Sequence, residues 1–510
     1  MRTKNSFINF LANEGSIIVN IILSFITRTV FIYTLGKAYL GVNGLFANVL
    51  SVLSLAELGI GTAMIYHMYA PVANNDFVLQ RKLMNLYRRL YKIVAAVVAV
   101  LGLILVPFLP YLIKEKDAAG IENLTLIYIL YLFNTVASYF FSYKRSIINA
   151  HQKMYVVTII DTICTSIQFI VQIVILLVFK NFILYLCIQI AAAILSNVFV
   201  SIRADKMYPF LKENKKDLPD EPLKKDIYKN IGAMSLHRFG DIFVNNTDNL
   251  IMSAFVGIII EGVYSNYLLI QTSVYTALNS VFLAVTASVG DLSVKEDKEK
   301  LYDVYKMLYF LCFWLFSFSS VCFITLYNPF ISFWTQKPDY TFEMPIVLLI
   351  VINFYFAGMR RVTLTFRDVL GLYWYDRYKP IFEAVINLVA SLILVQKIGI
   401  SGIFLGTLIS TLTTCFWIEP LVTYKYGFKR NVGEYFGRFA LYTAFTVAVG
   451  GLTYFLATRF EPGGLLEVAI KLLICIIVYN TILIAVFCRT NELQGLWKQA
   501  AKILRREHNA

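Results

Sequence analysis

The sequence predicts an all-α integral membrane protein with about 14 transmembrane helices. Hydrophobic residues make up 58% of its 510 residues and charged residues only 15%, a balance typical of membrane proteins. The apolar runs are close to the roughly 20 residues that a helix needs to cross a bilayer. They also lack the alternating ten-residue segments of a transmembrane β-barrel. A helical bundle is therefore predicted.

The predicted spans follow one another through most of the chain, separated by short polar or glycine-containing breaks. In chain order they are residues 13–35, 43–66, 90–113, 121–143, 154–178, 182–203, 231–256, 263–288, 304–327, 342–366, 378–396, 400–422, 436–458 and 465–487. A window of this length with few charges is the standard signature of a membrane helix.

The distribution of positive charge predicts the orientation. If the N-terminus is cytoplasmic, 36 of the 46 Lys and Arg residues fall in inner loops and tails and only 7 in outer loops. This bias is what the positive-inside rule requires, and it places both termini in the cytoplasm. The net charge of +14 is thereby attributed to topology and anionic lipid headgroups, and nucleic acid is not expected as a partner.

The longest break between spans contains KENKKDLPDEPLKK, whose charges and prolines predict a solvated cytoplasmic linker. The C-terminal tail places Leu493, Leu496 and Trp497 on one side, as in an amphipathic helix at a membrane surface. We therefore predict an N-terminal six-helix lobe, a linker, a C-terminal six-helix lobe, helices 13–14 and an amphipathic tail. Their boundaries are 1–210, 211–230, 231–430, 431–488 and 489–510.

The seventh predicted span carries an unusual set of polar residues. Its sequence, IGAMSLHRFGDIFVNNTDNLIMSAFVG, includes Arg238, Asp241, Asn245, Asp248 and Asn249. At about 100° per residue these side chains share one helical face about 100° wide. A charge facing lipid at mid-membrane costs at least about 2.5–3.5 kcal/mol, so this face is expected to turn away from the acyl chains. It is either a hydrogen-bonded seam between helices or one wall of a polar pathway.

The two halves of the chain repeat each other. The pair Gly36 and Gly41 recurs in the second half, with the same spacing, as Gly257 and Gly262. At the same offset, polar residues of the first span match the polar face of the seventh: Asn20, Ser24, Thr27 and Arg28 fall on Asp241, Asn245, Asp248 and Asn249.

A second match appears in the fifth and eleventh spans. At an offset only one position longer, Asp161 and Thr165 fall on Glu383 and Asn387. Six helices repeated after an even number of crossings keep their orientation, so the halves are expected to be parallel repeats about an axis along the membrane normal.

Three stretches resemble a known family of transporters. They are TDNLIMSAFVGIIIEGVYSNYLLI (247–270), INAHQKMYVV (148–157) and FRDVLGLYWYDRYKPIFEAVINLVASL (366–392). The chain resembles bacterial oligosaccharide flippases of the capsule or O-antigen repeat-unit type. These belong to the polysaccharide transporter family of the multidrug/oligosaccharidyl-lipid/polysaccharide exporter superfamily. The likeness covers essentially the whole chain.

This resemblance implies two six-helix lobes in a V-shaped bundle with a cationic central cavity between them. It implies alternating access for an undecaprenyl-diphosphate-linked oligosaccharide repeat unit, moved from the inner to the outer leaflet for surface polysaccharide biosynthesis. The expected location is the bacterial cytoplasmic membrane. Expected partners are membrane lipids and the glycosyltransferases and polymerase of the same pathway. Fourteen helices also suit the related lipid II flippases.

Buried cations are the chemistry that a sugar diphosphate requires. An arginine binds phosphate bidentately and keeps its charge when desolvated. Arg28 and Arg238 are predicted at different depths of the membrane, as two steps of a phosphate pathway, and amide side chains on the same faces suit sugar hydroxyls. The candidate headgroup residues are Arg28, Arg238, Asn20, Asn245, Asp248, Asn249 and Gln168. For Arg238 the alternative is a structural ion pair with Asp241.

The membrane carboxylates are candidates for coupling transport to an ion. Glu57 has no basic partner in its own helix, and either Glu57 or Asp241 is a candidate site for Na+ or H+, with a protonated packing carboxyl as the alternative for Glu57. No other cofactor and no metal site is expected. At the inner end, Arg360, Arg361, Asp161 and Glu383 are candidates for an inner gate. Their alternative roles are to snorkel (the arginines) or to hold inner loops through Lys153 or Lys379 (the carboxylates).

Two other classes of function compete with a repeat-unit flippase. A lipid II-type flippase or a multidrug or metabolite exporter would share the fold, and an exporter of cations should have an acidic cavity without the arginines. A membrane polysaccharide polymerase or glycosyltransferase usually needs a large outer loop or an accessible catalytic motif. Every predicted outer loop is short and no such motif occurs in an inner loop, so the chain is not expected to be an enzyme.

Overall fold

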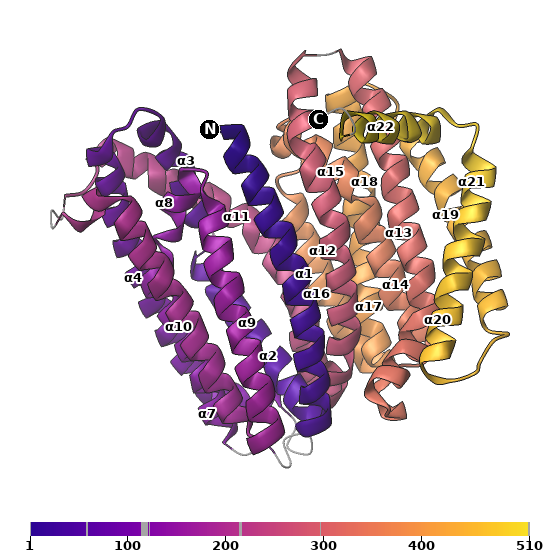
Figure 1. Ribbon diagram of the computed structural model, residues 1–510, viewed down its shortest axis with the longest axis horizontal. Coiled ribbons are helices and arrows are strands. Elements are labelled where there is room, and N and C mark those ends of the chain that lie inside the picture. Colours follow the sequence, from indigo (N-terminus) through magenta and orange to yellow (C-terminus); the bar gives the residue numbers. More distant parts are fainter. Residues whose placement is uncertain are drawn as a thin grey trace. The chain divides into compact units, whose positions relative to one another are not determined.

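The computed structural model describes residues 2–57, 60–113, 121, 123–213, 217–295 and 297–507. Within this part of the chain the secondary structure is helical throughout, joined by turns and short irregular segments (Figure 1). The chain divides into two compact units, Met1–Ser265 (unit 1) and Asn266–Ala510 (unit 2), each with its own set of packed helices. The predicted all-α membrane fold is confirmed.

Unit 1 is built from long helices joined by tight turns, with short helical pieces at several bends. Its elements are α1 (Arg2–Thr34), α2 (Lys37–Leu53), η1 (Ser54–Glu57), α3 (Ile60–Ala73), α4 (Phe77–Leu105), η2 (Val106–Phe108), α5 (Leu109–Leu112), α7 (Leu124–Ser142), α8 (Arg145–Ala150), α9 (Met154–Phe179), α10 (Phe182–Met207), η3 (Pro209–Lys212), α11 (Glu221–Ile251) and the π-helix η4 (Met252–Val256). The first turns of α12 (Ile258–Lys295), up to Ser265, complete it.

Unit 2 contains the rest of α12 and a second series of long helices. Its other elements are α13 (Lys298–Thr335), η5 (Pro338–Tyr340), α14 (Met344–Met359), α15 (Arg361–Val369), η6 (Leu372–Trp374), α16 (Lys379–Ile398), α17 (Ile400–Ser410), η7 (Thr411–Cys415), α18 (Phe416–Val422), η8 (Thr423–Phe428), α19 (Gly433–Ala457), α20 (Gly464–Ile474), η9 (Cys475–Tyr479), α21 (Asn480–Phe487) and α22 (Asn491–Glu507). The chain thus ends in the helix that the amphipathic tail predicted.

Each predicted span falls on one helix or on consecutive helical pieces, and several of these helices extend well beyond the predicted span: α4 begins at Phe77, whereas the predicted span begins at residue 90. Among the described residues, eleven helical stretches are long and apolar enough to cross a membrane. The three predicted spans outside that set fall on α2–α3, α11 and α12. Helix α11 falls outside the set because of its polar face, and α2–α3 falls outside it because η1 interrupts the helix. The protein is a multi-pass membrane protein.

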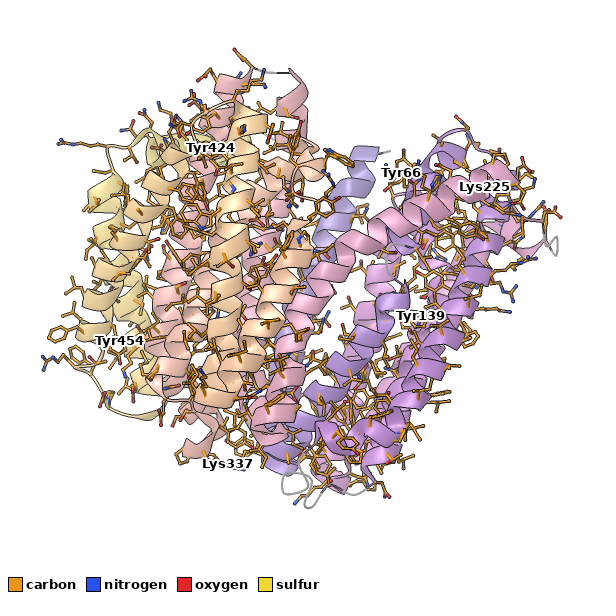
Figure 2. All side chains as sticks on the ribbon, turned by 180° about the vertical axis from the view of Figure 1, so that it is seen from behind. Tyr66, Tyr139, Lys225, Lys337, Tyr424 and Tyr454 are labelled. Atoms are coloured by element: carbon orange, nitrogen blue, oxygen red, sulfur yellow. The ribbon has the colours of Figure 1, made fainter. Side chains whose placement is uncertain are left out.

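The ends of unit 2 follow the predicted alternation of inner and outer loops. Lys337, after α13, and Tyr454, near the end of α19, lie toward one end of the unit (Figure 2). Tyr424, in η8, lies toward the other end (Figure 2). The sequence predicts the first two outside and the third inside. Helices α12 and α13 are each 38 residues long, about 57 Å. They are therefore much longer than a hydrocarbon core of about 30 Å, and the turn between them lies at the predicted inner end.

The cytoplasmic linker is shorter than the sequence predicts. We expected it to run to residue 230, but α11 begins at Glu221, with Pro222 in its first turn. Proline suits this position because its missing N–H would have no partner there in any case. The segment before the helix is also anchored, since the buried Arg81 of α4 contacts Glu213 and lies 3.9 Å from Asp217. The charges of this linker therefore hold it to unit 1.

Helix α11 packs within unit 1 against α2 and α3. Its first turns lie beside α3, where Lys225 and Tyr66 mark the same end of the unit (Figure 2). The Nδ2 atom of Asn230 lies 3.0 Å from Nε2 of His67 on α3. The division into compact units thus falls at Ser265, inside α12, whereas the sequence repeat begins again at α11. The predicted six-helix lobes describe the repeat and remain a prediction.

The repeated glycines make a reciprocal contact inside unit 1. A Cβ atom on Gly41 of α2 would overlap the carbonyl oxygen of Ile258, and one on Gly262 of α12 would overlap that of Lys37. The offset from Gly41 to Gly262 is the same as the offset from Lys37 to Ile258. Residue and partner therefore exchange roles across the contact, as they do in a two-fold symmetric interface. This contact is the strongest structural evidence that the halves are parallel repeats.

The turns that lead into this contact also require glycine. Gly36 precedes α2 with φ of 81° and Gly257 precedes α12 with φ of 132°. Residues with a Cβ atom are strained in this region, whereas glycine is not. The two turns and the two packing glycines together bring the backbones of α2 and α12 into direct contact.

The replacement Gly262→Ala should destabilise the protein by about 1–3 kcal/mol, because its methyl group overlaps the backbone of Lys37. The matched control is Gly451→Ala in α19, where an added Cβ meets nothing within 4 Å. Thermal unfolding of both variants in detergent measures the difference. Equal melting temperatures would show that α2 and α12 do not touch as described.

Candidate functional site

Arg28 of α1 is the most exceptional charge in unit 1. Its side chain is partly exposed, and its Nη1 atom donates a hydrogen bond of 3.1 Å to the hydroxyl of Ser265 on α12. Tyr131 of α7 and Tyr185 of α10 are close enough to interact with it electrostatically. No carboxylate in the described part of the chain lies within ion-pair distance of this guanidinium. A membrane cation in this state is stabilised by neutral dipoles alone and retains capacity for an anion.

The rest of the polar face of α1 belongs partly to a seam with α9. The hydroxyl of Ser16 accepts hydrogen bonds from Thr162 of α9 at 2.8 Å and from Nδ2 of Asn20 at 3.2 Å. Oδ1 of Asn20 is buried and has no hydrogen-bond partner. Gln168 bonds Gln172 one turn along α9, at 3.3 Å. Part of this face is therefore a hydrogen-bonded seam with α9, and Arg28 is not part of that seam.

The polar face of α11 is only partly within the described residues. The side chains of Arg238, Asp241 and Asn245 lie outside them, so their predicted roles remain predictions. Asp248 and Asn249 are placed in the last turn of α11, in unit 1, where Asn249 is buried. Asp248 is close to the phenol of Tyr264 on α12. At the repeat offset, Asn249 is the counterpart of Arg28.

An ion-pair network links the helices at the predicted inner end of unit 1. Arg145, the first residue of α8, donates from Nη1 and Nη2 to the two oxygens of Asp161 on α9, at 2.6 and 2.9 Å. Its Nε donates to Oδ1 of Asn197 on α10 at 3.0 Å, and Ser196 donates to Asp161 at 2.5 Å. Asp161 is therefore held by a bidentate arginine, not by Lys153 as the sequence suggested.

Unit 2 contains a larger version of the same network. Arg360, at the break between α14 and α15, donates to both oxygens of the fully buried Glu419 of α18, at 2.9 and 2.6 Å. Lys379 of α16 donates to the same carboxylate at 2.5 Å. Glu383 completes the group, 3.6 Å from Arg360 and 3.9 Å from Lys379. Two cations and two carboxylates are thus mutually compensated.

The acceptor positions of the two networks correspond in the repeat, whereas Arg145 falls on Arg367, not on Arg360, at the same offset. Glu383 corresponds to Asp161, and Glu419 corresponds to Asn197 at the same offset. Arg145 begins α8 and Arg360 directly precedes α15, so each arginine sits at a helix break before the inner loop. Such pairs fix how three helices of one unit cross. The contacts of Asp161, Arg360 and Glu383 are therefore structural in this state, and their role in an inner gate remains a prediction.

Arg361 is bonded differently from its neighbour Arg360. Its Nε atom is buried without a hydrogen-bond partner, and no described carboxylate lies within ion-pair distance of its guanidinium. It is close enough to Tyr275 of α12 to interact with that phenol electrostatically. Arg361 in unit 2 and Arg28 in unit 1 are thus two membrane-helix arginines that retain capacity for an anion.

Glu57 lies in η1, at the break between α2 and α3. It accepts a hydrogen bond of 2.9 Å from the hydroxyl of Tyr91 on α4, and Tyr139 of α7 is also close to it. Glu57 therefore faces phenols, not cations. Its role as a site for a coupling ion remains a prediction, as does the alternative of a protonated packing carboxyl.

Solved structures share this arrangement of helices. An inward-facing multidrug resistance MATE family transporter of the MOP superfamily matches with a TM-score of 0.60 and 16% identity, over 79% of this chain and 94% of that one. The lipid II flippase MurJ in an inward closed conformation matches with a TM-score of 0.65 and 16% identity, over 95% of this chain and 99% of that chain. A mutant of the Vibrio cholerae MATE transporter VcmN matches with a TM-score of 0.57 and 14% identity, over 84% of this chain and 99% of that chain.

The chain shares the fold of these transporters. At these identities the likeness establishes the fold and leaves the substrate open. The sequence itself matches no family model and no curated protein. The fold agrees with the superfamily that the sequence resemblance implied, whereas the narrower assignment to an oligosaccharide flippase stays a proposal.

The sequence analysis missed Arg145 and Glu419 of the two ion-pair networks, and it also missed the buried Glu261 of α12. Arg145 lies at a predicted inner end and was not distinguished from the topological charges, and Glu419 falls within a predicted span. Their signal was present, since Glu419 matches Asn197 at the offset that paired Asp161 with Glu383. Glu261 directly precedes the repeated Gly262, in what was predicted as a short outer loop. In α20, Lys471 donates to Glu467 one turn away, at 2.5 Å, and forms a further ion pair within unit 2.

The replacement Arg360→Ala should destabilise the protein by about 3–5 kcal/mol, because it leaves Glu419 buried with one cation in place of two. Arg430→Ala is the matched control, since Arg430 pairs with the exposed Glu299 and such pairs contribute about 0–1 kcal/mol. Chemical or thermal unfolding in detergent compares them. The double variant Arg360→Leu with Glu419→Leu should recover part of the loss, and a double variant less stable than Arg360→Ala would contradict this network.

Proposed function

We propose that this protein is a flippase that moves an undecaprenyl-diphosphate-linked oligosaccharide repeat unit from the inner to the outer leaflet of the bacterial cytoplasmic membrane. The observation that carries the proposal is Arg28, a membrane-helix arginine whose hydrogen bond goes to a neutral hydroxyl. A cation in a membrane helix without a carboxylate partner is costly and is by default a functional-site hypothesis. A phosphate group would supply the missing charge.

The chemistry of the substrate fits this site. A diphosphate cannot cross hydrocarbon unaided, because burying an unpaired ion costs far more than one transport step can supply. Arginine remains protonated when desolvated and binds phosphate through two parallel N–H groups. Arg361 has the same lack of a carboxylate in unit 2. Two such arginines, with Arg238 as a predicted third, would bind a diphosphate in successive steps.

The fold supports a transporter that works by alternating access. Parallel repeats related by an axis along the membrane normal are the architecture in which two halves rock around a shared site. The first two helices of each half, α1–α2 and α11–α12, form two repeated hairpins, and Gly41 and Gly262 bring their backbones into close contact. One structural neighbour is a lipid II flippase, whose substrate by name is a lipid. Flipping a lipid-linked glycan is the proposal that combines this fold with unpaired arginines.

Multidrug or metabolite export is the second candidate, because MATE transporters share the fold. An exporter of organic cations needs acidic groups in its pathway. In unit 1, Asp161 is neutralised by Arg145, and in unit 2, Glu383 and Glu419 are compensated by Arg360 and Lys379. These carboxylates are therefore not free for an organic cation, whereas Arg28 and Arg361 have no carboxylate partner among the described residues and favour an anionic substrate. Glu57, which faces phenols, is a described carboxyl that an exporter of cations would use. A lipid II-type substrate has the same diphosphate and is the alternative within this class.

The expected partners follow from this assignment. They are the lipid-linked substrate, membrane lipids, and the glycosyltransferases and polymerase that act before and after flipping. Both termini are predicted to be cytoplasmic, and Na+ or H+ coupling remains part of the proposal. We do not expect the protein to be an enzyme.

Arg28→Ala should lower flipping of a fluorescent undecaprenyl-diphosphate-linked oligosaccharide in proteoliposomes by roughly 10- to 100-fold, since one charge-assisted contact contributes about 1.5–3 kcal/mol. Arg28→Lys should retain part of the rate, because it keeps the charge but loses the bidentate geometry. Ser265→Ala should have a small effect, since it leaves the charge in place.

Arg459→Ala is the control for loss of a positive charge elsewhere. Arg459 follows α19 and lies over the ring of Phe455, 4.5 Å from its centroid. The Arg459→Ala variant should flip the lipid at the wild-type rate. Normal flipping by both Arg28 variants would refute the role of Arg28. Export of organic cations by the wild-type protein, without flipping of the lipid, would favour the second candidate.

A further inference from the structure

A buried carboxyl group lies directly beside the reciprocal glycine contact. Glu261, in the first turn of α12, has only 2% of its surface exposed. It accepts hydrogen bonds from the hydroxyl of Ser253 in η4 and from Nδ2 of Asn48 on α2, the latter at 3.3 Å. Its Oε1 atom would lie 2.7 Å from a Cβ on Gly44, so only glycine leaves room for it there. The Glu261 carboxyl group thus links η4, α2 and α12.

No cation compensates this carboxyl in the part of the chain that the structure describes. The basic residues nearby are Lys37, at the start of α2, and Arg28, on α1. Neither lies within the 4.0 Å of Glu261 that defines an ion pair. Among the other titratable groups on α11 and α12, Asp248 and Tyr264 lie close to each other.

The repeat shows that packing alone does not need an acid at this position. The counterpart of Glu261, at the offset that relates the glycines, is Leu40 on α2, which is equally buried. A leucine therefore fills the corresponding place in the other hairpin. The two hairpins share their turns and their glycine contacts, and only one of them has placed a carboxyl group next to the contact. That difference calls for a role other than packing.

The environment favours the protonated form of Glu261. Burial away from water disfavours the charged form of a carboxyl group, and the two neutral partners compensate a full charge only in part. The N-terminus of α12 contributes roughly half an elementary charge of favourable potential, which is also partial. If water reached the group, it would be ionised at neutral pH, as solvated glutamates are.

We propose that Glu261 is a proton-binding site of the transport cycle, occupied when α2 and α12 are packed as described here and vacated when their contact loosens. Any change in the angle between these helices moves Glu261 relative to Asn48, because the backbones touch at Gly41 and Gly262. Proton binding therefore stabilises one packing of the hairpins over another. The transport part of this inference rests on the proposed flippase function.

Infrared difference spectroscopy of the purified full-length protein in lipid nanodiscs tests proton occupancy without any substrate. The wild-type protein at pH 7 should show a carbonyl stretching band of a protonated carboxylic acid that is absent from Glu261→Gln. Glu57→Gln is the matched control, because Glu57 is also a membrane carboxyl bonded by neutral hydroxyl groups. A band that disappears in Glu57→Gln and persists in Glu261→Gln would overturn the proposal.

Flipping in proteoliposomes tests the coupling. A gradient of one pH unit should change the wild-type rate by up to about tenfold, the factor that one proton per cycle supplies. Glu261→Gln should flip at a rate that does not respond to the gradient, while its melting temperature stays close to that of the wild type. An unchanged response to the gradient would refute the coupling, and a sodium response that is lost in Glu261→Gln would assign the site to sodium.

These experiments separate the two proposals. If the wild-type protein does not flip the lipid at all, the proposed function fails, while the infrared result still decides whether Glu261 holds a proton. Glu261→Leu adds a control for folding, since Leu40 shows that the hairpin accommodates leucine. If Glu261→Leu and Glu261→Gln both fail to fold, the carboxyl is a structural group and the proposal is wrong.

Discussion

The backbone contact between α2 and α12 is the constraint on which the rest of the molecule depends. It requires two glycines at the contact and two more in the turns that precede it, with φ values that other residues rarely adopt. Because the contact is reciprocal, it relates the first half of the chain to the second without any intervening side chain. The contact fixes the distance between the two backbones, and the hydrogen bond from Asn48 to Glu261 joins the same two helices beside it.

Charge compensation inside each unit determines which polar groups remain available. Arg145 and Arg360 are each engaged by carboxylates of the same unit, so they contribute to helix packing. Arg28 and Arg361 have the same chemistry and no such partner among the described residues. Desolvation acts on all four guanidinium groups. Their difference therefore lies in their neighbours, and it separates structural arginines from those suited to bind an anion.

The sequence was sufficient for the fold class, the spans and the repeat, because apolar length, charge bias and glycine spacing are local signals. It also singled out Arg28 and the offset that relates Asp161 to Glu383, whose functional roles stay predictions. It could not supply partners that lie far apart in the chain, such as Glu419 for Arg360, since ion pairs depend on how helices cross. The start of α11 was placed too late because charges in a helix extension resemble those of a linker.

The two inner networks differ by one pair of charges, and this difference constrains how the halves diverged. Asn197 and Val157 in unit 1 correspond to Glu419 and Lys379 in unit 2. A chain that gained Lys379 alone would bury an uncompensated ammonium group beside Arg360, and one that lost Glu419 alone would leave two cations facing each other. Either intermediate is penalised. At these two sites we therefore expect substitutions of Lys379 and Glu419 to be tolerated better as a pair than one at a time.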